Sequence, residues 1–162
     1  MSPSNPRTHG NIRTPGMTIR AALLSLMVLA PAGALADTWQ TWRLLESVEV
    51  TEMHEGERFR VQKDFPDALR AATQGFEIAG YVVPVVPEPW MTTFLLVERP
   101  EDCPFCGSGY GPSTTVEVYL DRPMKDLPEF SYVELRGDLE LVEDPDTMQM
   151  FRLLNAKVLP GS

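Results

Sequence analysis

The chain has 162 residues, of which 43% are hydrophobic and 23% charged, and its formal charge is −9 at pH 7. The first 36 residues contain three arginines and no acidic residue, so the 126 residues that follow hold all 23 Asp and Glu residues. Their formal charge is therefore about −12, which repels phosphate backbones and argues against a nucleic-acid partner.

The segment 1–36 has the features of a cleavable secretory signal peptide. Its arginines are followed by an apolar stretch, AALLSLMVLA, and by the small-residue pattern ALA that ends at residue 36. The apolar stretch is shorter than the roughly 20 residues that a membrane span needs. Met17 is a second candidate start, because the segment from Met17 onward is a complete signal peptide by itself. We predict a signal peptide over 1–36 and one exported, periplasmic domain over 37–162, with no transmembrane segment in it.

The first part of this domain, residues 38–75, is predicted to contain both extended and helical segments. The segment 38–50, TWQTWRLLESVEV, is expected to be an extended lead-in or a first strand. The polar segment 51–57, TEMHEGE, predicts a turn, and the alternating RFRVQ of 58–62 predicts a half-buried strand. The segment 65–75, FPDALRAATQG, predicts a short helix, with a proline in its first turn and a glycine at its C-terminal end.

The rest of the domain is rich in strands. Apolar residues alternate with polar ones or form short runs, and Gly80 within the first run suggests a bulge or a barrel corner. We predict a mainly β fold, a small OB-like five-stranded barrel with one short helix, because closure removes exposed strand edges. A β-sandwich is the alternative. The five predicted strands cover residues 76–86, 92–98, 114–120, 130–143 and 148–159.

Three markers carry a resemblance to a known family: the G-Y-x-x-P of Gly80 to Pro84, the cysteine pair after a strand, and the closing RLLNAKV. Over roughly residues 42–159, the chain resembles an uncharacterised family of small exported proteobacterial proteins. Some members of that family are encoded beside genes for metal-uptake ABC transporters, especially for zinc. The resemblance implies a periplasmic or inner-membrane transporter component as the partner.

The only two cysteines, Cys103 and Cys106, lie in the sequence CPFCG, for which three interpretations are open. The pattern C-P-x-C is similar to a thioredoxin-like redox site. Such a site needs a helix N-terminus to lower the thiol pKa, and the GSGYGPS that follows cannot continue a helix. A thiol-disulfide oxidoreductase is therefore the least supported interpretation.

The second interpretation is a metal site, because C-P-x-C-G is one half of a zinc-ribbon site. Zinc takes three or four protein ligands, and His54 is the only histidine after the signal peptide. Cys103, Cys106 and His54 are thus the candidate ligands, with zinc or Cu(I) as the candidate metal. Met148 and Met150 add thioethers that suit Cu(I), or they fill the core.

The third interpretation is a Cys103–Cys106 disulfide, which is usual for two nearby cysteines in an exported protein and would cross-link a glycine-rich loop. With one histidine after the signal peptide and no G-x-S-x-G motif, the sequence predicts no hydrolase. We expect a non-catalytic periplasmic binding or accessory protein that assists zinc or copper uptake or transfer beside an ABC transporter. The alternatives are a structural or protein-interaction module with the disulfide, and the oxidoreductase.

Overall fold

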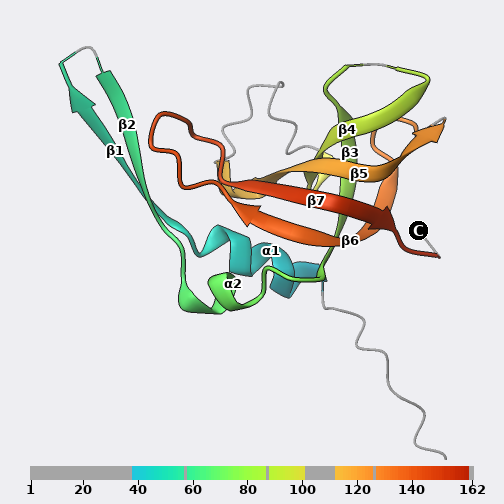
Figure 1. Ribbon diagram of the computed structural model, residues 1–162, viewed down its shortest axis with the longest axis horizontal. Helices are drawn as coiled ribbons and strands as arrows, with labels where there is room; N and C mark the ends of the chain where they lie inside the picture. The colour runs from blue at the N-terminus through green and yellow to red at the C-terminus, as the bar shows by residue number, and fades with distance from the viewer. Residues whose placement is uncertain (1–37, 57, 87, 101–111, 126, 161–162) are drawn as a thin grey trace, which may run out of the picture. The chain divides into compact units, whose positions relative to one another are not determined.

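The residues described below all lie in the unit Gly33–Ser162. The computed structural model describes residues 38–56, 58–86, 88–100, 112–125 and 127–160. None of the helices in these ranges is long and apolar enough to span a membrane. The elements (Figure 1) are, in chain order, α1 (Thr38–Glu46), β1 (Glu49–Glu55), β2 (Arg58–Asp64), α2 (Asp67–Ala71), β3 (Phe76–Pro84), β4 (Trp90–Val97), the 3-10 helix η2 (Pro112–Thr114), β5 (Thr115–Lys125), β6 (Tyr132–Leu141) and β7 (Phe151–Val158).

Five strands form a closed barrel in the order β3-β4-β5-β7-β6, and β6 pairs back onto β3. All neighbours are antiparallel except β5 and β7, which run parallel. The predicted mainly β fold with a small OB-like five-stranded barrel is confirmed, and the β-sandwich alternative is wrong.

β3 contributes to two parts of the barrel wall. Its residues 76–81 pair with β6, and its residues 81–84 pair with β4. Gly80 lies where the strand passes from one neighbour to the other. A Cβ at this position would overlap the carbonyl oxygen of Val97 and would lie 3.2 Å from the Trp42 ring. The expectation that Gly80 marks a corner of the barrel agrees with this position.

We expect Gly80→Ala to lower the free energy of unfolding by about 3 kcal/mol, because the backbone of β4 must move to admit the methyl group. Urea denaturation measures the change. Gly56→Ala is the matched control, because Gly56 has a φ of +67° but open space around it. Its cost is conformational only, about 1 kcal/mol. Equal effects of the two substitutions would contradict the steric explanation.

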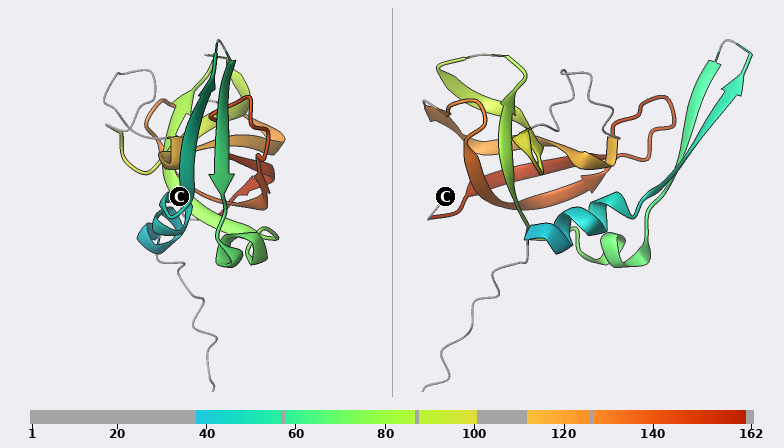
Figure 2. Two further views of the ribbon diagram at one scale, coloured as in Figure 1. Left: turned by 90° about the vertical axis from the view of Figure 1, so that its left-hand side faces the viewer. Right: turned by 180° about the vertical axis from the view of Figure 1, so that it is seen from behind.

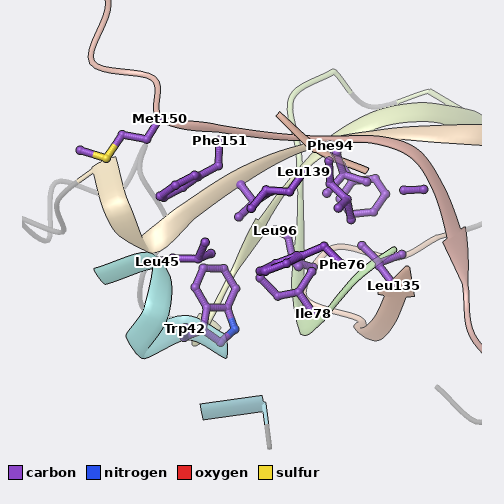
Figure 3. Packing of buried hydrophobic residues seen from close by; sticks show 14 of the residues in the cluster. Trp42, Leu45, Phe76, Ile78, Phe94, Leu96, Leu135, Leu139, Met150 and Phe151 are labelled. Carbon is purple, nitrogen blue, oxygen red and sulfur yellow. The ribbon is translucent and has the colours of Figure 1, made fainter. Parts of the chain in front are cut away.

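The interior of the barrel is one apolar core, to which every strand of the wall contributes. Phe94 and Phe151 are fully buried within it, and α1 adds Trp42 and Leu45 to the same cluster (Figure 3). The indole Nε1 of Trp42 donates a hydrogen bond of 2.8 Å to the carbonyl oxygen of Ala79. The helix is therefore fixed to β3 by both apolar packing and a directional bond.

The prediction of an extended segment over 38–50 is wrong, because residues 38–46 form α1. Trp42 and Leu45 are three residues apart, so they face the same side of a helix and are buried together, whereas Trp39 and Arg43 are exposed. The predicted helix in 65–75 is confirmed as α2, so the single predicted helix is one of two α-helices in the described ranges.

The prediction of a turn over 51–57 is also wrong. Residues 49–55 form β1, which pairs in antiparallel register with β2, and Gly56 supplies a positive φ at the connection. The strand predicted at 58–62 is confirmed within β2. β5 continues to Lys125, well beyond the predicted end at residue 120, because Met124 and Lys125 pair with β4.

Candidate functional site

β1 and β2 form a separate two-stranded sheet, here called the arm, which extends away from the barrel (Figures 1 and 2). Most of its side chains are exposed. The exceptions lie in the half of the arm near the barrel, where Val61 is buried and Val50 and Lys63 are half-buried. The arm therefore has an anchored base and a solvent-exposed outer half.

Lys63 anchors the base to the loop between β6 and β7. Its Nζ donates hydrogen bonds to three carbonyl oxygens, those of Val142 (2.9 Å), Asp144 (2.9 Å) and Gln149 (2.6 Å). Three donors on one nitrogen require the ammonium form. Burial lowers the pKa of Lys63, while the charge of Asp144 opposes that shift. Holding an ammonium here thus costs solvation energy, which the three carbonyl bonds offset.

Further contacts join β2 to the same loop. The backbone N–H of Val61 donates to the carbonyl oxygen of Pro145 at 2.8 Å, and the Nε of Arg60 lies 3.6 Å from the carboxylate of Asp146. The Arg60–Asp146 pair is largely exposed, so it contributes little stability. The backbone bond and the lysine contacts fix the direction of the arm.

The β6–β7 loop is held from its other side by a polar network on the barrel wall. Gln149 donates through Nε2 to Glu117 and accepts a 2.7 Å bond from Nη2 of Arg152. Arg152 also lies between two carboxylates, 3.5 Å from Glu117 and 3.4 Å from Glu140. Burial raises the pKa of the Tyr119 hydroxyl, as does its hydrogen bond to Glu117. Nε of Arg152 is buried without a hydrogen-bond partner among the described residues. The other contacts of this network tie the loop to the barrel wall, so we assign these groups to positioning the loop.

The outer half of the arm exposes large apolar groups. Met53 and Phe59 are each 37% exposed, and the rings of His54 and Phe59 pack against each other at 5.4 Å. A two-stranded hairpin is marginally stable in water on its own. Within the described ranges, no other strand pairs with β1. The outer half thus exposes two large apolar side chains among charged ones, and it is the candidate docking element of the molecule.

The predicted metal ligands are only partly located. Cys103 and Cys106 lie outside the described residues, and the disulfide, metal and redox interpretations of that pair remain predictions. His54 lies on β1, exposed and packed on Phe59. Across the described ranges, no three His, Cys, Asp or Glu side chains are grouped so that they could hold a metal ion. Met150 is 1% exposed and belongs to the core, so it fills the interior.

Sequence reasoning found His54 as a candidate residue and the strand at 58–62, but it missed β1, the hairpin and Lys63. A signal for the hairpin was present, because a glycine lies between two segments of equal length that contain β-branched and aromatic residues. No sequence signal marks Lys63, because its partners are backbone carbonyls.

Comparison of the chain with protein-family models, with curated proteins and with solved structures finds no match. The resemblance to the exported family is therefore supported only as far as the closed five-stranded barrel. Function must be argued from the surfaces of the barrel and the arm.

Proposed function

We propose that this protein is a non-catalytic binding or accessory protein that docks onto a partner protein through its β1–β2 arm. The observation that carries the proposal is the anchoring of the arm. Lys63 donates hydrogen bonds to three loop carbonyls at the base of the arm, and the outer half of the arm exposes Phe59 and Met53. These contacts keep the hairpin in a fixed direction, so its exposed side chains are already placed for a partner. A periplasmic or inner-membrane transporter component, as the family resemblance implies, is the proposed partner class.

The surface of the arm that we propose for docking has apolar side chains at its centre and charged groups at its border. The arm offers Phe59 and Met53 as apolar anchors, with carboxylates along β1 and the guanidinium groups of Arg58 and Arg60 on β2. Aromatic anchors with a charged border are typical of the centre and rim of protein interfaces. Zinc or Cu(I) transfer remains a prediction from Cys103 and Cys106, and the described residues add no ligand set to it.

The test places a photo-reactive benzoylphenylalanine at position 59 in the cell that makes the protein. We expect a covalent adduct with one defined partner, identified by mass spectrometry. Position 119 is the control, because Tyr119 is also 37% exposed but lies on the barrel wall. With the purified partner, we expect Phe59→Ser to weaken binding about tenfold or more. Equal adducts from both positions, or unchanged affinity of Phe59→Ser, would overturn the proposal.

A further inference from the structure

The two ends of the barrel differ. Trp42 and Leu45 of α1 close the end at which β3 begins. The opposite end is formed by the β3–β4 connection and by the segment between β5 and β6, and no helix of the described ranges covers it (Figure 2). A hydrogen bond of 2.7 Å from the N–H of Phe130 to the carbonyl oxygen of Val82 holds that segment against β3.

Two adjoining hollows lie at this open end, and both are lined by Met91 and Glu88. The larger has a volume of about 550 Å³, and the smaller about 210 Å³. The larger is lined by Pro84, Glu88, Met91, Leu127 and Glu129. The smaller is lined by Val85, Val86, Glu88, Met91, Thr92 and Thr93. Two separate hollows with a shared wall suit two neighbouring side chains of one extended segment better than one compact molecule.

The surface around the hollows is unusually apolar for an acidic chain. Val85 is 47% exposed, Val86 57% and Trp90 56%, and all three belong to the β3–β4 hairpin. Their grouping on one hairpin distinguishes them from the scattered exposed apolar residues of ordinary surfaces. A ligand for this end must therefore bring apolar surface of its own.

The backbone at Phe130 gives an independent indication of function. Phe130 has a φ of +60°, in the left-handed region that bulky residues rarely adopt, and it is 38% exposed. The bond to Val82 holds it there, as does the turn in which the hydroxyl of Ser131 donates to the carbonyl oxygen of Pro128 at 2.8 Å. Strained conformations of this kind cluster at ligand-binding segments.

The charged residues that line the hollows favour a positively charged ligand. Glu88 and Glu129 line the hollows, and no Lys or Arg is among the lining residues of either hollow. The nearest cation by strand pairing is Lys125, opposite Trp90 on β5. A formal charge of −9 attracts cations over longer distances, and the exposed indole of Trp90 offers a cation–π face.

We infer that the open end of the barrel binds an extended polypeptide segment in which Lys or Arg alternates with large apolar side chains. The apolar side chains enter the two hollows, and the cations meet Glu88 and Glu129. This site is separate from the arm, so the inference stands or falls independently of the proposed docking function.

Three blocked synthetic peptides test the inference by calorimetry at low salt: a Leu-Arg-Leu-Arg-Leu peptide, its Leu-Glu-Leu-Glu-Leu counterpart and a Ser-Arg-Ser-Arg-Ser peptide. We expect the first to bind with a Kd on the order of 10 μM and the other two at least tenfold more weakly. Equal binding of the Ser-Arg peptide would mean attraction by charge alone and would overturn the inference, as would absence of binding by the Leu-Arg peptide.

Substitutions at the open end of the barrel test whether the peptide binds there. Trp90→Ser and the double variant Glu88→Gln/Glu129→Gln should each weaken binding of the Leu-Arg peptide at least fivefold. The double variant Glu49→Gln/Glu52→Gln is the control, because it removes the same charge from exposed positions of the arm. An equal loss in this control would place the binding elsewhere and would refute the assignment, whereas Phe59→Ser should leave peptide affinity unchanged.

Discussion

Replacing Trp42 with alanine is expected to lower the free energy of unfolding by about 4–6 kcal/mol, a large part of the stability of a small domain. The indole is fully buried and packs against the β3 side of the core. Truncating a buried tryptophan costs about 3–5 kcal/mol through lost burial and the remaining cavity. The carbonyl oxygen of Ala79 also loses its 2.8 Å bond, which adds about 1 kcal/mol.

Urea denaturation followed by far-UV circular dichroism measures this effect. Trp39→Ala is the control, because Trp39 lies on the same helix, is 50% exposed, and has the guanidinium of Arg43 over its ring at 5.2 Å. We expect it to cost less than about 1 kcal/mol. Trp42→Phe keeps an aromatic ring without the donor and should cost about 2 kcal/mol, so it remains measurable if the alanine variant does not fold. Similar costs for Trp39→Ala and Trp42→Ala would contradict the role of α1 in the core.

The helix that carries Trp42 could not be read from the sequence because its stability comes from tertiary contacts. Threonine and tryptophan are weak helix formers, and the first two turns of α1 contain two of each. The helix forms because Trp42 and Leu45 reach the barrel together, and Trp42 bonds to a residue 37 positions away. Local propensity does not contain that information.

The barrel strands were predictable because each has one face in the core and one face outside. β6 illustrates this: Val133, Leu135 and Leu139 are buried, while neighbouring charged residues point outward. Gly80 was recognisable for the same reason, because a glycine inside an apolar strand needs a steric cause. The pattern also indicated the five strands of the barrel. Closing a barrel of five strands requires at least one parallel pair, which here is β5 and β7.

The strand β1 and its pairing with β2 escaped prediction because neither face of the outer half of the arm is buried. β1 has the sequence EVTEMHE, and its described side chains are exposed except for Val50, so no alternation between core and solvent exists to be seen. Pairing with β2 makes it a strand. The β6–β7 loop that anchors the arm lies 79 to 86 residues beyond Lys63. Carbonyl oxygens belong to every residue type, so this anchor has no sequence signature.

Lys63→Met is expected to release the arm, with a loss of about 2–3 kcal/mol of unfolding free energy. Methionine keeps the apolar stem that lies beside the loop but removes all three bonds to the carbonyl oxygens of Val142, Asp144 and Gln149. Those oxygens are only partly replaced by water, because two of the three bonds are part-buried. The local effect should exceed the global one, since the barrel core does not depend on Lys63.

Hydrogen exchange separates the two effects. In Lys63→Met, the amides of β1 and β2 should exchange at least tenfold faster, while those of β3 and β6 should change in proportion to the smaller global loss. Lys157→Met is the matched control, because Lys157 is exposed on the outside of β7 and its loss should change stability by less than about 0.5 kcal/mol. If the arm docks onto a partner in a fixed direction, Lys63→Met should also weaken that docking although Lys63 lies away from the exposed outer half. Exchange rates in the arm that match those of the native protein would show that the three carbonyl bonds do not hold it.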